Sequence, residues 1–213
     1  FKFAYNIPCP GTPTVTYDGQ VYNTVQIFSQ CWLKENLNVG EMINAPAFPS
    51  QNGFIEKYCY DNDSFNCIEY GGIYHWAELM NYNYNAGTQG ICPEGWHIPT
   101  DEEFKILYGC VDSMYPIGDP EWDKYYTEMG YDAGYHLRST SGWWSNNNGS
   151  DKFGFTGKGA GFLLWEYIGM DGFYNLNSSL ILETSKNGFG EPIQHEIRGA
   201  YSTVLRTDTW PRS

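Results

Sequence analysis

The chain has 213 residues, which is enough for one substantial hydrophobic core, and no repeat divides it. Its formal net charge of -13 argues against partners that are themselves anionic, such as nucleic acid phosphates and acidic membrane surfaces. Aromatic residues make up 18% of the chain, and 24 Gly and 11 Pro favour many short strands and turns around two helices.

The N-terminus shows neither Met nor the architecture of a signal peptide, so we expect a removed targeting segment or a piece of a longer protein. No run reaches the roughly 20 apolar residues of a membrane span, and direct insertion is not expected. Residues 1–14 form a predicted lead-in segment held by Cys9, and residues 15–213 a single domain. Asp18-Gly19 separates two β-prone runs, which predicts a hairpin.

The cysteines number six, an even count that indicates an oxidising compartment and up to three disulfides. One pair brackets a short acidic loop, a second flanks the hairpin, and the third follows by elimination. Six cysteines allow about fifteen connectivities, so this pairing is one choice among them. Zinc is the weaker alternative because no CxxC occurs. The predicted pairs are Cys59–Cys67, Cys9–Cys31 and Cys92–Cys110.

Two helices are predicted in the first half of the domain. Residues 69–82 place apolar side chains at helical spacing, including Ile73 and Met80. A second helix begins after Thr100 and continues to Val111. Its first turn has a capping box, in which Thr100 and Glu103 satisfy each other's backbone N–H groups.

Beyond this helix the periodicity is weaker. A short helical stretch is predicted around residues 121–129, within an insertion rich in aromatic residues. Residues 161–185 alternate short apolar runs with Gly and Asn, which favours the strands of a final sheet.

The segment GICPEGWHIPTDEEF, residues 90–104, resembles the signature of the Fibrobacter succinogenes major paralogous domain family of bacterial surface and secreted modules. Further blocks resemble the family in order over residues 15–173. The resemblance implies an α+β, C-type-lectin-like fold with twisted antiparallel sheets and long loops. Arg206 is similar in position to an arginine of the family's last strand.

More distantly, WHIPTDEEF is similar to the formylglycine-generating-enzyme-like group, whose activity uses copper held by cysteines near the C-terminal end. No cysteine follows Cys110, so this activity is not expected. No nucleophile elbow or zinc-binding HExxH surrounds the histidines, and we expect no enzyme. His97 is expected to hydrogen-bond backbone within the signature loop.

Two oxygen-rich segments are candidate calcium sites, since calcium takes six to eight oxygen ligands. Turn chemistry is the favoured explanation of such Asn and Asp clusters, because these side chains bond their own backbone. No other cofactor is expected. The candidate metal ligands are Asp61, Asp63, Asn66 and Asp151.

A ligand-binding loop is predicted around the second segment, where two tryptophans adjoin the asparagines. We therefore expect non-catalytic recognition of a glycan, with or without calcium, in a secreted or cell-surface adhesion module. The alternative is a structural subunit that docks on a partner protein through its aromatic insertion, in a larger surface assembly; an enzyme of unknown reaction is third. The candidate ligand-binding residues are Trp143, Trp144, Asn146, Asn148 and Asp151.

Overall fold

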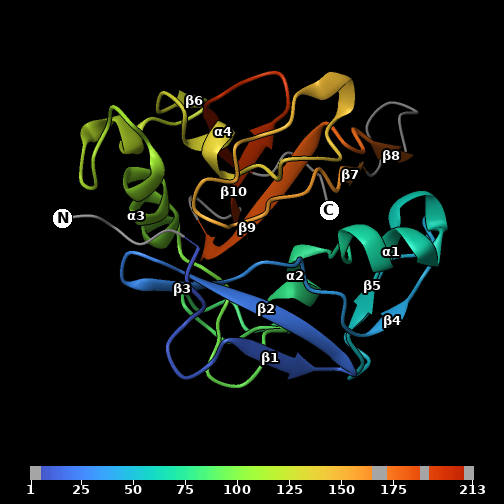
Figure 1. The fold of residues 1–213 in the computed structure, drawn as a ribbon. Coiled ribbons are helices and arrows are strands. Elements are labelled where there is room, and N and C mark those ends of the chain that lie inside the picture. The colour runs from blue at the N-terminus through green and yellow to red at the C-terminus, as the bar shows by residue number, and fades with distance from the viewer. Residues whose placement is uncertain (1–5, 165–171, 188–191, 209–213) are drawn as a thin grey trace.

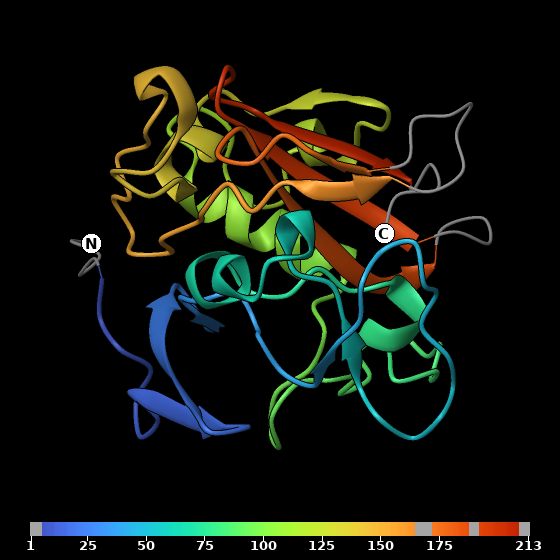
Figure 2. The ribbon, with the colours of Figure 1, turned by 90° about the vertical axis from the view of Figure 1, so that its right-hand side faces the viewer.

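The computed structural model describes residues 6–164, 172–187 and 192–208, and it shows a mixed α and β structure with few helices and several antiparallel sheets (Figure 1). A three-stranded sheet and a four-stranded sheet lie in opposite halves of the molecule, as a second view confirms (Figure 2). None of the helices in the described ranges has the length and apolar character needed to cross a membrane. The helices are α1 (Ser64–Tyr70), α2 (Trp76–Leu79), α3 (Asp101–Val111) and α4 (Ala133–Leu137), with 3-10 turns η1 (Tyr60–Asn62), η2 (Pro120–Asp123) and η3 (Trp144–Asn146).

The predicted hairpin is confirmed in the three-stranded sheet, which has the order β1-β2-β3. Asp18 and Gly19 connect the first two strands with φ angles of 47° and 74°. Both angles lie in the left-handed region that a two-residue hairpin turn requires. The strands are β1 (Thr14–Tyr17), β2 (Gln20–Ile27) and β3 (Gln30–Leu33), and a small parallel pair follows in β4 (Glu41–Met42) and β5 (Glu56–Lys57).

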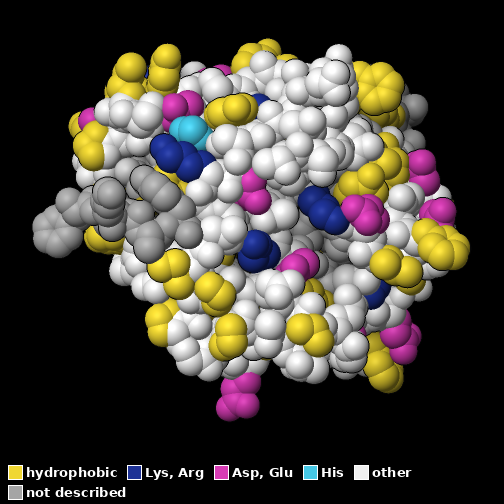
Figure 3. Space-filling view, viewed as in Figure 1, with side chains coloured by type: hydrophobic (Ala, Val, Ile, Leu, Met, Phe, Trp, Pro, Cys, Tyr) yellow, Lys and Arg dark blue, Asp and Glu magenta, His cyan; other side chains and the backbone are white. Residues whose placement is uncertain are grey.

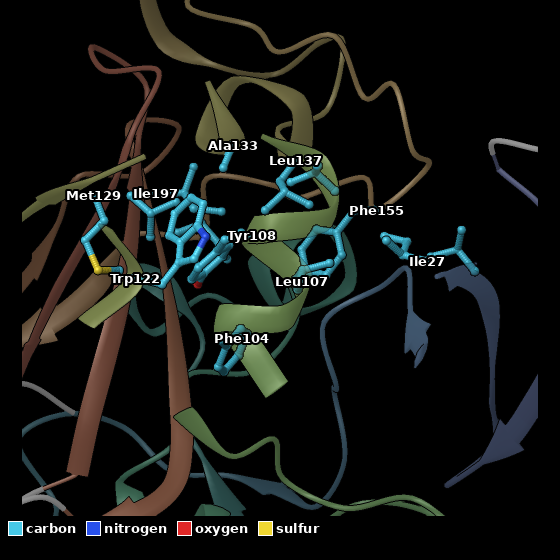
Figure 4. Packing of buried hydrophobic residues seen from close by; sticks show 14 of the residues in the cluster. Ile27, Phe104, Leu107, Tyr108, Trp122, Met129, Ala133, Leu137, Phe155 and Ile197 are labelled. Atoms are coloured by element: carbon cyan, nitrogen blue, oxygen red, sulfur yellow. The ribbon is translucent and has the colours of Figure 1, made fainter. Parts of the chain in front are cut away.

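The four-stranded antiparallel sheet has the order β6-β11-β10-β9, and α3 packs against it. The helix turns Phe104, Leu107 and Tyr108 into the main core, where Trp122 and Ile197 meet them (Figure 4). The helix predicted from Thr100 to Val111 is therefore confirmed. The remaining strands are β6 (Thr127–Met129), β7 (Phe162–Leu164), β8 (Gly172–Tyr174), β9 (Ser179–Asn187), β10 (Pro192–Arg198) and β11 (Val204–Asp208).

The strands predicted within residues 161–185 are confirmed in part. β7 and β8 form an antiparallel pair, and β9 joins the four-stranded sheet. Residues 165–171, which lie between β7 and β8, are outside the described residues.

The helix predicted over residues 69–82 is wrong in extent. Gly71, with φ of 85°, ends α1, and Ile73 pairs with Tyr58 in an isolated β-bridge. Only four residues of the predicted span then return to a helix, in α2. The apolar side chains have helical spacing, but Gly71 and Gly72 interrupt the helical backbone conformation.

The helix predicted around residues 121–129 is also wrong. Pro120 begins a 3-10 turn that ends at Asp123, and the chain then extends into β6, which pairs with β11. Met129, the last residue of β6, is buried, and this burial outweighs the weak helical signal of the local sequence.

Two of the predicted disulfides are present, Cys9–Cys31 and Cys59–Cys67. The third is wrong, because Cys92 and Cys110 are free thiols. Cys92 is buried in a second core beside Val39 and Tyr74, whereas Cys110 packs against the main core. The two thiols thus belong to different hydrophobic clusters.

Candidate ligand-binding surface

The signature segment is anchored by a buried ion pair between α3 and β11. Asp101 is the first residue of the helix, and its Oδ2 accepts a hydrogen bond of 2.6 Å from Nη2 of Arg206. Oδ1 accepts a bond of 2.8 Å from Nε of the same guanidinium. His195 on β10 lies 3.1 Å from the same Oδ1 through its Nε2. The arrangement ties the helix N-terminus to two strands of the sheet.

Burial and charge set the protonation of this cluster. Burial would raise the pKa of Asp101, but hydrogen bonds from His195 and Arg206 hold it well below its usual range. Burial lowers the pKa of His195, against the opposing influence of the Asp101 carboxylate. We infer a neutral imidazole between an ionised carboxylate and the aromatic rings of Phe104 and Tyr108. Asp101, His195 and Arg206 are all buried, and they form a structural centre.

The remaining histidines each have a local partner. His97 contacts the Glu103 carboxylate at 2.9 Å, so its predicted backbone partner is wrong, although it does fasten the loop to α3. His75 caps α2 by accepting a hydrogen bond from the backbone of Ala77. His136 lies 2.7 Å from the hydroxyl of Ser150. The Nε2 atom of His136 also lies 3.3 Å from the Asp132 carboxylate, so this imidazole stands between a hydroxyl and a carboxylate.

The loop that carries the candidate ligand-binding residues is built around a buried tryptophan. Trp143 is only 5% exposed, and its Nε1 donates to the Ser139 hydroxyl at 3.1 Å and to the Gly157 carbonyl at 3.2 Å. The guanidinium of Arg138 lies 5.5 Å from the centre of its ring. Trp143 therefore holds the loop from below and does not face solvent.

The neighbouring ring has the opposite placement, because Trp144 is 71% exposed. Its backbone N–H donates to the Asn177 carbonyl at 2.7 Å, which fixes its position in η3. Asn148 accepts a hydrogen bond of 3.1 Å from the backbone of Trp143, and Asn146 is exposed with φ of 60°. The structure thus separates the predicted set into a support, Trp143 and Asn148, and an exposed part, Trp144 and Asn146.

Three further exposed rings belong to the segments that surround this loop. Arg138 donates to the carbonyl groups of Arg198 and Tyr201, and Tyr135 donates its backbone N–H to the Ser202 carbonyl. These bonds join α4 to the turn after β10. We call the exposed rings on these connected segments the aromatic face; they are Tyr131, Tyr135, Trp144 and Tyr201.

Of these rings, Tyr201 was absent from the sequence-based prediction. It lies on a turn between two strands, and the Arg198 guanidinium stacks over its ring at 4.3 Å. An aromatic residue in a polar turn was the available signal, since a turn is an exposed place for a large ring.

The candidate calcium ligands are engaged in local bonds. Asp151 accepts from both the backbone and the hydroxyl of Thr156, at 2.7 Å and 3.0 Å. Asp63 caps α1 by accepting from the Phe65 backbone, and Asn66 donates to the Tyr60 carbonyl. Asp61 is exposed on η1, beside these two residues. Asp63, Asn66 and Asp151 thus each take part in a local hydrogen bond that holds a turn.

Within the described ranges, no three His, Cys, Asp or Glu side chains are grouped so that they could hold an ion. Asp151 belongs to a different part of the chain from Asp61, Asp63 and Asn66. Calcium binding therefore stays a prediction for titration, and no step below depends on it.

Comparison with known proteins places the chain in a family. A family model described as the Fibrobacter succinogenes major domain matches residues 25–182, which is most of the chain. The protein belongs to this family, as the signature segment predicted. No curated protein matches the chain, and no solved structure does so either.

Proposed function

We propose that the domain is a non-catalytic recognition module, secreted or at a bacterial cell surface, that binds glycan through the aromatic face. The observation that carries this proposal is the exposed ring of Trp144 on a loop that buried hydrogen bonds hold in place. A flat ring with a polar edge suits the apolar face of a sugar. A fixed loop lowers the entropic cost of binding.

The polar groups beside the rings complete this argument. Asn146 is exposed next to Trp144, and the Arg198 side chain lies over Tyr201. Amide and guanidinium groups donate hydrogen bonds to sugar hydroxyls and can fix the orientation of a ring. The two disulfides are compatible with an oxidising, extracellular setting.

The proposal includes a C-type-lectin-like arrangement of the fold. Supporting it are the helix of the signature segment on an antiparallel sheet, and the long irregular connection between α4 and β7 that carries Trp144. Fold alone does not define a ligand, so the glycan proposal rests on the surface and not on this likeness.

A glycan array probed with the labelled domain tests the proposal, with a Trp144→Ala variant and a matched Phe54→Ala control. Phe54 is 63% exposed and lies on a different loop. Loss of a hot-spot ring costs about 1.4 kcal/mol or more, so binding of a positive glycan weakens at least roughly tenfold for Trp144→Ala. The Phe54→Ala control keeps the wild-type affinity.

Each array is run with calcium and with excess chelator, which separates metal-assisted from metal-independent recognition. Equal binding by the wild type and Trp144→Ala would contradict the proposed surface. An array without any positive glycan would contradict the ligand class.

A partner protein that docks on the aromatic insertion is the second possibility at this face. Trp122 is fully buried and belongs to the main core, and the Arg206 guanidinium covers Tyr125 at 4.9 Å. Among the aromatic residues of the insertion, Tyr126, Tyr131 and Tyr135 are exposed. The insertion therefore offers a partner less surface than its aromatic content suggested.

A further inference from the structure

The acidic segment between Cys59 and Cys67 leads into the short helix α1. A disulfide and hydrogen bonds to other parts of the chain hold this helix in place. The disulfide joins the turn before α1 to the middle of the helix. The Asn62 side chain accepts from the Ala45 backbone N–H at 2.8 Å and donates to the carbonyl of the same residue at 3.2 Å. A seven-residue helix is marginal alone, so these ties fix its position.

The C-terminal end of α1 is tied down as well. Asn36 donates through its side chain to the Tyr70 carbonyl at 2.8 Å. Lys158 reaches both the carbonyl and the carboxylate of Glu69, at 2.9 Å and 2.7 Å. The helix is thus fixed at both ends.

Despite this, α1 directs its large apolar side chains toward solvent. Phe65 and Ile68 are 76% and 75% exposed, and Cys67 is the buried residue of the helix. The two positions are three apart, so their side chains lie next to each other on one helix face. Neither side chain contributes to the core, and their apolar character has no role in folding that the structure shows.

Acidic groups border this apolar pair. Asp61, Asp63 and Glu69 are exposed on the same segment, and the Lys158 side chain already pairs with Glu69. Figure 3 shows apolar and acidic side chains side by side at the edge of the molecule over α1. A surface with an apolar centre and a charged rim has the pattern of a protein interface.

We propose that α1 is a docking site for a partner protein whose apolar pocket is rimmed by Lys and Arg. Phe65 and Ile68 would fill the pocket, and Asp61 and Asp63 would face the basic rim. A second copy of this chain is disfavoured, because it would bring the same acidic groups together. An anionic membrane is disfavoured for the same reason.

The test uses a synthetic helical peptide of Leu and Lys, with one apolar stripe flanked by lysines, and a matched Leu and Glu peptide. Titrations are followed by calorimetry and by amide NMR shifts of the labelled domain. A Phe65→Ser/Ile68→Ser variant is compared with Val21→Ser/Phe54→Ser, which removes two apolar side chains of similar exposure from other elements. Both variants keep the net charge, and thermal melts verify that both fold.

We expect the Leu and Lys peptide to shift amides of residues 61–70 and to bind roughly tenfold or more weakly to Phe65→Ser/Ile68→Ser, with the control within about twofold of wild type. Asp61→Asn, whose φ of 55° suits Asn, should weaken binding and reduce its salt dependence.

Equal affinity for both double variants, or shifts that lie elsewhere, would overturn the proposal. Sedimentation that shows self-association lost in Phe65→Ser/Ile68→Ser would replace the partner with a second copy. Binding to vesicles of anionic lipid, lost in the same variant, would replace it with a membrane. Trp144→Ala belongs to the other surface, so the two proposals fail independently.

Discussion

Removal of Arg206 should destabilise the fold strongly. This arginine neutralises Asp101, which is 1% exposed at the start of α3. Arg206→Met leaves this carboxylate buried without its main partner, which costs about 3–5 kcal/mol of unfolding free energy. Urea denaturation measures the loss.

Arg198→Met is the matched control, because Arg198 also pairs with a carboxylate, that of Glu128, but both side chains are partly exposed. Exposed or partly exposed pairs contribute about 0–1 kcal/mol, so this variant should remain close to wild type. Equal losses for the two arginines would contradict the structural role of the buried pair.

Glu183 is a half-buried carboxyl group, and it makes stability depend on pH in the opposite sense to Asp101. Burial raises the pKa of Glu183 to about 8, against the effect of a hydrogen bond from Gln194. The folded protein thus holds a proton that the unfolded chain releases above its ordinary pKa of 4.5. Stability from this group is complete below that value and is lost as the pH rises through about 8.

Glu183→Gln should therefore raise the melting temperature by a few degrees at pH 8 and leave it unchanged near pH 4, since an amide keeps the acceptor without the charge. Calorimetric melts at the two pH values provide the measurement. A variant that melts lower at pH 8 would show that the ionised carboxylate has a stabilising contact.

For single residues, the sequence predicts contacts between near neighbours in the chain but not contacts between distant residues. Thr100 and Glu103 are three positions apart, so their capping box could be inferred from spacing. Asp101 and Arg206 are separated by 105 positions, and only the resemblance drew attention to the arginine. Trp143 and Trp144 are adjacent and chemically alike, yet one is buried and the other exposed, which no local pattern distinguishes.

The capping box is the element-scale feature that defines where α3 begins. The Thr100 hydroxyl accepts from the Glu103 backbone at 3.3 Å, and the Glu103 carboxylate accepts from the Thr100 backbone at 2.8 Å. Thr100→Ala should cost about 1 kcal/mol in urea unfolding. Thr16→Ala, at an exposed strand position, is the control and should change stability by less than about 0.5 kcal/mol. A cap that contributes nothing would give two indistinguishable curves.

The ends of helices and strands could be predicted where one local backbone preference decided them. The prediction was wrong where two preferences conflicted. The Asp18-Gly19 turn and the Thr100 cap act on their own neighbours, and both are confirmed. Residues 69–82 have helical spacing of their apolar side chains, but Gly71 adopts a positive φ that ends the helix. A Cβ at Gly71 would approach the Asn36 side chain to 2.4 Å, so close packing against a distant segment requires glycine there.

At the scale of the whole molecule, the fold has separate hydrophobic cores that no sequence pattern delimited. The main core lies between α3 and the four-stranded sheet, and a second core gathers around Met80 and Ile98. The sheet order β6-β11-β10-β9 brings a strand of the insertion beside the last strand of the chain. The sequence analysis paired Cys92 with Cys110 by elimination. A count of cysteines cannot show that the two residues lie in different hydrophobic cores.

The state of these two thiols gives a test of the whole architecture. Alkylation of the denatured, unreduced protein should label two cysteines, Cys92 and Cys110, since the other four are bridged. In the native protein Cys110 should react first, because it borders a cavity of about 470 Å³, which is in the size class of small-molecule sites. Burial raises the pKa of Cys92 to about 12 and of Cys110 to about 11, so both should react slowly at neutral pH. Peptide mass mapping identifies the labelled sites. Labelling of neither cysteine would mean that they are bridged and that the two cores are joined, whereas faster labelling of Cys92 would place it outside the second core.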